Sequence, residues 1–253
     1  MTAHCVQTTI KRSWWYSLFA VGALGELLGW IARLWSWRCP YNNTAFVMQI
    51  SVLIIAPCFY SAAIYYILSQ LISLWGTRYS PLSPRLYLII FASFDLLSII
   101  IQAVGGSLAS KASSAEPPKS TLVGTHTMMA GIIIQLISMS VFAILFVWVL
   151  WKARAVPRTR KLELLLAVTS FSAACIIIRN FYRAVELSQG WKGYLITHEV
   201  YFDVLDGMLM VLAVLVFNFV HPAWFLQRSR SKYHAVEGLQ LKTNDTPGDA
   251  GNA

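Results

Sequence analysis

Long blocks that lack charged side chains constrain this sequence more than any other feature. Residues 44–76 carry no charge, residues 86–110 carry only Asp95, and residues 120–151 and 207–227 carry none apart from one histidine each. A helix that crosses a bilayer needs about 20 mostly apolar residues, because its backbone polar groups must bond within the segment. The blocks therefore predict an all-α, polytopic transmembrane bundle of about six helices, at roughly residues 14–35, 46–74, 86–109, 124–151, 162–184 and 200–226.

The composition excludes an ordinary soluble domain. Of the 253 residues, 57% are hydrophobic and only 12% are charged, about half the charged share of a typical soluble domain. Residues 1–13 are predicted to form a short tail, residues 14–226 the helix bundle, and residues 227–253, which are polar, a disordered tail. The first apolar block is full-length rather than short, so no cleavable signal peptide is expected.

The net charge of +9 suggests a nucleic-acid partner at first sight, but its distribution indicates an orientation in a membrane. Thirteen lysines and arginines fall in residues 1–13, 75–85, 152–161 and 227–253, whereas four fall in the loops of the opposite side. Basic residues accumulate in cytosolic loops. Both termini are therefore predicted to be cytosolic. Membrane lipids are the expected partners, and no nucleic-acid partner is expected.

Motifs for catalysis are missing from the sequence. The cysteines at positions 5, 39, 58 and 175 have no paired spacing, and no two of the five histidines lie four residues apart. No G-x-S-x-G, phosphate-loop or dinucleotide motif is present. We therefore expect no catalytic residue, no metal site and no cofactor.

Each of the last two blocks carries three charged residues with the spacing i, i+4, i+7, which places the three on one helix face. These residues are Arg179, Arg183 and Glu186 in the fifth block, and Glu199, Asp203 and Asp206 in the sixth. The two helices run antiparallel, so Arg183 is expected to lie level with Glu199 or Asp203. In the same way, Arg179 is expected to lie level with Asp206. We interpret the set as an interhelical ion-pair ladder.

The remaining blocks add polar residues at a comparable depth, namely Glu26, Gln49, Asp95, Gln102 and Gln135. Several helices with polar residues at one level predict a polar cavity, and the alternative is that these residues only bond one another and fix helix packing. The intramembrane acids outnumber the bases by six to three, and no arginine is expected at the depth of Glu26 or Asp95. Asp95 is expected to be functional, and its alternative is a neutral acid bonded to a neighbouring helix.

These considerations assign two sets of candidate residues. The candidates for substrate binding or proton relay are Glu26, Asp95, Gln102, Gln135, Asp203 and Asp206. The ion-pair scaffold is assigned to Arg179, Arg183, Glu186 and Glu199.

Small residues and one proline predict local features of helix packing. Gly25 and Gly29 form a small-xxx-small pair, which indicates a close contact with another helix. Pro57 lies within the second block and is expected to kink that helix, with a hinge as the alternative.

The polar and small residues follow an order along the chain that is specific as a set. They comprise Glu26, Gly29, Arg33, Gln49, Pro57, Ala63, Tyr65, Asp95, Ser98, Gln102, Gly105, Gly106, Gly124, Gly131, Gln135, Arg179, Tyr182, Arg183, Glu186, Gly190, Glu199, Asp206, His221 and Pro222. In this order, over about residues 20–225, the chain resembles the fungal RTA-like family of lipid-translocating exporters. That family includes a sphingoid long-chain base exporter and aminocholesterol-resistance proteins.

Two features depart from the family that the chain resembles. Its members usually have seven spans with an outer N-terminus, whereas the first span has no counterpart in residues 1–13. Six spans agree with two cytosolic termini. An aromatic residue usually stands at the position of Asp203, which here adds an acid to the candidate site.

The resemblance implies export or flipping of a lipid-like amphiphile, such as an amine-bearing sphingoid base, and resistance to toxic amphiphiles. It implies a plasma-membrane location, with an internal membrane as the alternative. No ATP site is present, so transport is expected to be facilitated, proton-coupled or driven by another protein. The residues alone also fit a membrane sensor or receptor-like signalling protein with an outer polar pocket, or a scaffold without a ligand.

Overall fold

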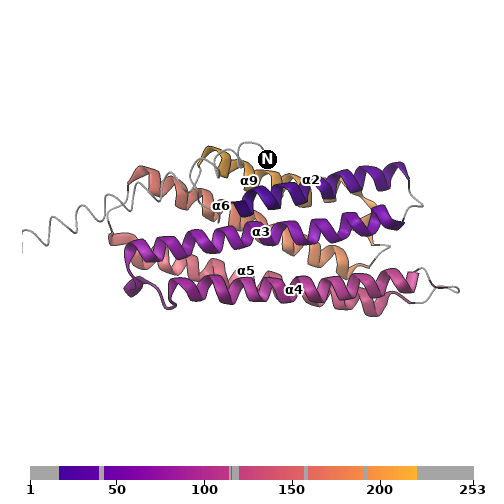
Figure 1. Ribbon diagram of the computed structural model, residues 1–253, viewed down its shortest axis with the longest axis horizontal. Helices are drawn as coiled ribbons and strands as arrows, with labels where there is room; N and C mark the ends of the chain where they lie inside the picture. Colours follow the sequence, from indigo (N-terminus) through magenta and orange to yellow (C-terminus); the bar gives the residue numbers. More distant parts are fainter. Residues whose placement is uncertain are drawn as a thin grey trace, which may run out of the picture.

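The computed structural model describes residues 17–39, 43–113, 115, 120–156, 159–190 and 193–220, and most of them are helical (Figure 1). The long helices are α2 (Ser17–Arg38), α3 (Asn43–Trp75), α4 (Pro84–Ser113), α5 (Leu122–Lys152) and α6 (Arg160–Ser188). The last crossing comprises α8 (Glu199–Phe202), the π-helix η4 (Asp203–Met208) and α9 (Leu209–Phe219). Short pieces are the 3₁₀-helices η2 (Thr77–Tyr79) and η3 (Ala153–Ala155), and α7 (Tyr194–Thr197).

Six helical segments are long and apolar enough to cross a membrane, which confirms the predicted fold class and makes the chain an integral multi-pass membrane protein. The described residues contain no strand. Several helices extend beyond the predicted spans: the first continues to Arg38, and the fifth runs from Arg160 to Ser188. Residues 14–16, residues 221–226 and both predicted tails lie outside the described residues.

Local sequence explains where several helices begin and end. Pro84 is the first residue of α4, a position where its missing amide hydrogen has no helical partner to lose. The side chain of Thr159 caps the start of α6 by accepting a hydrogen bond from the amide of Leu162 at 3.4 Å. After α3 the chain turns at Gly76 with φ of 95°, a conformation that a residue with a Cβ rarely adopts.

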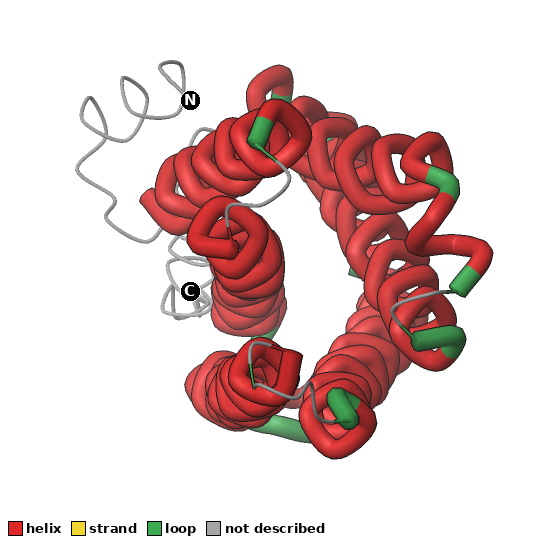
Figure 2. The backbone as a smooth tube through the Cα atoms, turned by 90° about the vertical axis from the view of Figure 1, so that its right-hand side faces the viewer, coloured by secondary structure: helices red, strands yellow, loops and turns green. Residues whose placement is uncertain are grey.

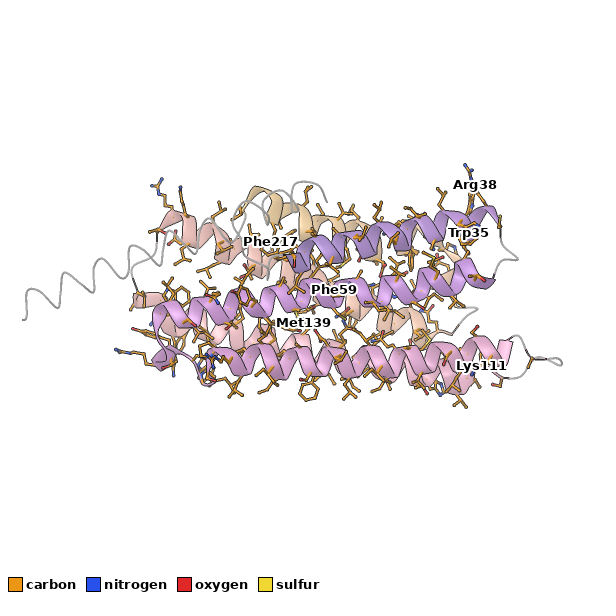
Figure 3. All side chains as sticks on the ribbon, in the orientation of Figure 1. Trp35, Arg38, Phe59, Lys111, Met139 and Phe217 are labelled. Carbon is orange, nitrogen blue, oxygen red and sulfur yellow. The ribbon has the colours of Figure 1, made fainter. Side chains whose placement is uncertain are left out.

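The helices form a closed ring when the bundle is viewed along its length (Figure 2). Each of α2 to α5 packs against the next long helix, and α6 packs against α9. The ring closes between α9 and α2, where the rings of Phe217 and Phe19 lie 4.6 Å apart. We use "outer end" for the end of the bundle where α2 and α4 end, which is marked by Arg38 and Lys111 in Figure 3.

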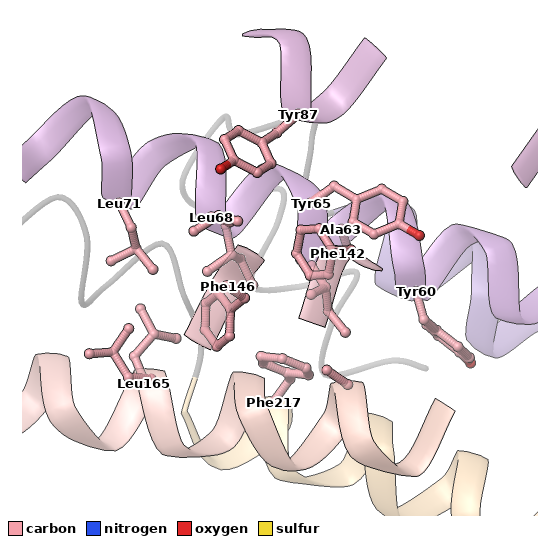
Figure 4. Packing of buried hydrophobic residues seen from close by; sticks show 14 of the residues in the cluster. Tyr60, Ala63, Tyr65, Leu68, Leu71, Tyr87, Phe142, Phe146, Leu165 and Phe217 are labelled. Carbon is pink, nitrogen blue, oxygen red and sulfur yellow. The ribbon is translucent and has the colours of Figure 1, made fainter. Parts of the chain in front are cut away.

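The inner half of the bundle is a packed aromatic and aliphatic core (Figure 4). Tyr60 and Tyr65 of α3, Phe142 and Phe146 of α5 and Phe217 are each at most 2% exposed. The rings of Tyr65 and Phe142 lie 4.5 Å apart. Most of the intramembrane candidates named from the sequence lie between this core and the outer end, whereas Asp95 lies at the edge of the core, where it bonds Tyr65.

Glycines set the closest helix contacts. A Cβ on Gly29 would lie 2.5 Å from Cδ2 of Leu53, and one on Gly25 would lie 3.0 Å from Cβ of Ala56, which confirms the predicted close contact of α2. Between α4 and α5 even the backbones touch, because a Cβ on Gly105 would lie 2.5 Å from the backbone nitrogen of Met128. These contacts leave little freedom for α4 to shift along α5.

The orientation of the bundle stays a prediction, and it can be tested by protease protection. Tags fused to either terminus of the full chain should resist protease added to intact cells, because the basic residues place both termini in the cytosol. A tag inserted after Ser113, at the outer end of α4, should be cleaved in the same cells and serves as the control. Cleavage of a terminal tag in sealed cells would contradict the six-span orientation.

Candidate functional site

An arginine–carboxylate cluster connects α6 with the last crossing. Arg179 Nε lies 3.0 Å from Oδ1 of Asp206, and Arg183 Nε lies 3.8 Å from the same oxygen. Arg183 also bonds Glu186 on its own helix, with 2.7 Å between Nη1 and Oε2. Arg179 and Asp206 thus lie level with each other, as predicted, and Asp206 forms ion pairs with both arginines. Its side chain is fully buried, so these two arginines compensate the cost of burying it.

Asp203 does not join this cluster in the predicted way. It lies 3.5 Å from Nε of Arg33 on α2 rather than beside Arg183, and its side chain is 54% exposed. The guanidinium of Arg33 also stacks on Phe202, at 4.3 Å from the ring centroid. The prediction assumed α-helical spacing, but residues 203–208 form a π-helix, in which Asp203 and Asp206 no longer share a face. The side chain of Glu199 lies outside the described part of the structure.

Pro57 exposes a backbone acceptor that Arg179 occupies. Proline has no amide hydrogen, so the carbonyl of Leu53, four residues earlier, lacks its helical donor. Nη2 of Arg179 donates to this carbonyl oxygen at 2.7 Å. Arg179 therefore ties the break in α3 to Asp206 of the last crossing, and its side chain is only 4% exposed. Whether Pro57 acts as a kink or as a hinge stays a prediction.

Glu26 of α2 adds a carboxylate beside the cluster. Both of its side-chain oxygens are buried and accept no well-formed hydrogen bond from the described residues, although Trp30 is an adjacent donor. It is close enough to Arg179 and Arg183 to interact with both electrostatically. The expectation that no arginine shares the depth of Glu26 is therefore wrong. The ring of Trp30 packs on Gly207, where no side chain would fit, and holds α2 against the π-helix.

A second polar group lies between α3, α4 and α5. Nε2 of Gln102 donates to Ser98 at 2.7 Å and to Oε1 of Gln135 at 3.2 Å. Gln135 in turn donates to the sulfur of Cys58 at 3.1 Å. Asp95 accepts a hydrogen bond of 3.0 Å from the hydroxyl of Tyr65, and its other oxygen is buried without a partner in the described chain. Asp95 therefore bonds a neighbouring helix, as its alternative interpretation supposed.

These two polar groups contact different parts of α3, and the predicted polar cavity stays a prediction. Helix α3 runs between them and presents the Leu53 carbonyl to Arg179 and the sulfur of Cys58 to Gln135. The sequence indicates how deep a residue lies along a helix, but it does not fix the direction in which that helix faces. Residues at one depth were therefore grouped together although a helix separates them.

A cavity of about 410 Å³ lies in the outer half of the bundle between α3, α4 and the start of α5, within the range of small-molecule sites. Aliphatic residues of α3 and small residues of α4 form most of its wall, and Gln102 contributes an amide. Asp95, Glu26 and the arginine cluster do not line it. Of the described residues, no group of three His, Cys, Asp or Glu is placed to hold a metal ion.

Three of these features were missed from the sequence alone. The π-helix has no sequence signature that we used, and a backbone carbonyl such as that of Leu53 does not enter a count of charged side chains. The cavity could have been found, because Ala103, Gly106 and Ser110 repeat small residues at i, i+3 and i+7 along one face of α4.

Comparison with known proteins now connects this architecture with a family. A profile described as RTA1 like protein matches residues 19–229. Sphingoid long-chain base transporter RSB1 of Saccharomyces cerevisiae is 32% identical over 270 residues, which cover 91% of this chain and 70% of the transporter. Protein RTA1 of the same yeast is 30% identical over 223 residues, covering 85% of this chain and 68% of that protein. Protoporphyrin uptake protein 1, also from this yeast, is 32% identical over 206 residues, covering 79% of this chain and 66% of that protein.

No solved structure matches the chain. The family profile, however, spans most of the sequence, from the third residue of the first crossing through the last one. The quoted relatives are also named for transport or uptake in two cases out of three. From this coverage we conclude that the chain belongs to the RTA1-like protein family.

Proposed function

We propose that this protein moves lipid-like amphiphiles across a membrane and that the cavity between α3, α4 and α5 holds the substrate. The observation that carries the proposal is this cavity, which is largely aliphatic and lies within the membrane-crossing part of the bundle. The sphingoid long-chain base transporter that resembles the chain supports a single-chain amphiphile as the class of substrate.

The packing of the bundle supports access from one leaflet. The aromatic core fills the inner half, whereas the cavity, Gln102 and the arginine–carboxylate cluster lie in the outer half. With both termini in the cytosol, the cavity belongs to the outer leaflet, as an exporter or flippase needs for substrate release. In a plasma membrane this release would remove a toxic amphiphile from the cell and give resistance.

The charged cluster has a supporting part in this proposal. Its arginines are bonded to carboxylates and to a backbone carbonyl, so they fix α3, α6 and the last crossing together. We assign Arg179, Arg183, Asp206 and Glu186 to this scaffold. Gln102 and Gln135 remain candidates for substrate binding because Gln102 lines the cavity and Gln135 bonds it.

The test is transport by the purified full chain in liposomes. A fluorescently labelled sphingoid base is placed in both leaflets, and a membrane-impermeant quencher added outside reports how fast the inner pool moves outward. We expect a faster second phase of quenching with the protein than in vesicles prepared without it. If the second phase is no faster than in protein-free vesicles at several protein-to-lipid ratios, the proposal is contradicted and a sensor is favoured.

Asp95→Asn belongs to the same experiment as a matched variant. It keeps the size of the side chain and can still accept the hydrogen bond from Tyr65, but it cannot carry a charge. A folded variant with full transport would leave Asp95 as a packing residue. A folded variant that has lost transport would support the proton-relay assignment.

A further inference from the structure

The cavity exists because α4 carries small residues on two sides. Toward α5, Gly105 allows backbone contact, so α4 is fixed in place. Toward α3, the wall of α4 consists mainly of Ala103, Gly106, Ser107 and Ser110, which are too small to fill the space between the helices. Larger side chains of the same segment, Val104 among them, are exposed on the membrane-facing side instead. The void is therefore a consequence of the residue sizes on α4.

The cavity is accessible from the side, between α3 and α4. Its lining on α3 includes Val47, Ser51 and Ile55, which are exposed and lie at i, i+4 and i+8 on one face. On α4, Ala103 and Ser107 are both exposed and line the cavity. Exposed residues in the crossing segment of a single chain face lipid. An amphiphile in the outer leaflet can thus enter without leaving the bilayer.

The polar groups of the cavity are uncharged. The amide nitrogen of Gln102 donates hydrogen bonds to Ser98 and Gln135. Its oxygen Oε1 accepts no hydrogen bond from the described residues. The hydroxyls of Ser51 and Ser110 likewise donate to no described residue. The site therefore offers one carbonyl acceptor and hydroxyls that both donate and accept, but no carboxylate.

We infer that this cavity recognises a single-chain amphiphile through its hydroxyl groups and offers no counter-charge to an ammonium group. A ligand hydroxyl can donate to Oε1 of Gln102 and exchange hydrogen bonds with Ser51 and Ser110. An ammonium group would lose its hydration there without a counter-charge, because Asp95 is bonded to Tyr65 and does not line the cavity. The inference rests on the proposed function for the lipid-like nature of the ligand.

The experiment is a binding assay on the purified full chain in detergent, independent of transport. Two probes with the same chain length are compared, octadecane-1,2-diol and octadecylamine. A ligand at concentration L that binds only the folded protein stabilises it by RT ln(1 + L/Kd), so the rise of the melting temperature with ligand concentration yields a dissociation constant. We expect the diol to bind at least tenfold more tightly than the amine. Equal binding of the two, or tighter binding of the amine, would overturn the inference.

Neighbouring positions on α4 provide matched variants. Ala103→Leu fills the cavity and should abolish binding of the diol, whereas Val104→Leu, on the exposed face next to it, should leave binding unchanged. Ser51→Ala and Ser110→Ala change no packing of note, and each should weaken diol binding about two- to tenfold through one lost hydrogen bond. Unchanged binding in both Ala103→Leu and the serine variants would place the ligand elsewhere.

The outcomes separate this inference from the proposed function. Diol binding that Ala103→Leu removes, without any transport in liposomes, would keep the site and reject transport. If Ala103→Leu and the serine variants leave transport intact, transport is supported and the proposed binding site is rejected. A native dimer that Ala103→Leu converts to a monomer would assign this face to a second copy of the chain and would also reject the site.

Discussion

Replacing Arg179 by methionine is expected to destabilise the folded bundle by about 3–5 kcal/mol, because it leaves the buried Asp206 with one more distant arginine. The same change removes the donor to the carbonyl of Leu53, which has no helical donor because of Pro57. Methionine keeps much of the side-chain volume, so the loss of stability measures the lost polar interactions and not lost packing. The measurement is unfolding of the purified protein by a denaturing detergent, followed by tryptophan fluorescence.

Arg160→Met on the same helix is the control for this prediction. Arg160 is the first residue of α6 and is exposed, so its replacement should change the free energy of unfolding by less than about 0.5 kcal/mol. Equal stabilities of the Arg179→Met and Arg160→Met proteins would show that the buried pair does not hold α6 against the last crossing.

The role of the Leu53 carbonyl can be isolated with a double-mutant cycle. Pro57→Ala restores an amide hydrogen at position 57, which can donate to Leu53 in the ordinary helical manner. In that background Arg179→Met should cost about 1–3 kcal/mol less, because the carbonyl no longer depends on the arginine. The part of the loss that comes from Asp206 should remain. A cycle without any coupling would contradict the link between the break in α3 and Arg179.

The sequence predicted the parts of this structure that depend on one helix at a time. Uncharged blocks fixed the number of crossings, and the spacing of Arg179 and Arg183 correctly placed both on a face directed at Asp206. Both inferences use only the length and the periodicity of a helix. They succeed because a membrane restricts the backbone to helices that cross it.

The candidate site could be predicted only in part, since it depends on how helices face one another. Gln102 and Glu26 were assigned to one level, but Gln102 bonds Gln135 on one side of α3, whereas Glu26 lies beside the arginine cluster on the other. The π-helix redirects Asp203 toward Arg33 and leaves Asp206 buried. A spacing rule for α-helices cannot describe such a turn. The size of side chains on α4, rather than any charge, determines where the cavity lies.

Gly105→Ala and Gly106→Ala should have opposite effects although the two residues are adjacent in α4. Alanine favours a helix over glycine by up to about 1 kcal/mol. At Gly106 the new Cβ would lie 3.7 Å from the sulfur of Met128, which is ordinary contact, so this variant should be as stable as the native protein or more stable. At Gly105 the new Cβ would lie 2.5 Å from the backbone nitrogen of Met128, and α4 and α5 would have to separate.

We therefore expect Gly105→Ala to lower the free energy of unfolding by about 1–3 kcal/mol, in spite of the better helix propensity of alanine. The melting temperatures of the two variants in the same detergent provide the measurement, and each variant serves as the control for the other. Gly124 meets the same contact from α5, since a Cβ there would lie 2.7 Å from the carbonyl oxygen of Gly105. Gly124→Ala should accordingly resemble Gly105→Ala. Equal melting temperatures for all three variants would mean that α4 and α5 are not packed backbone to backbone, and the cavity beside them would then lose its fixed wall.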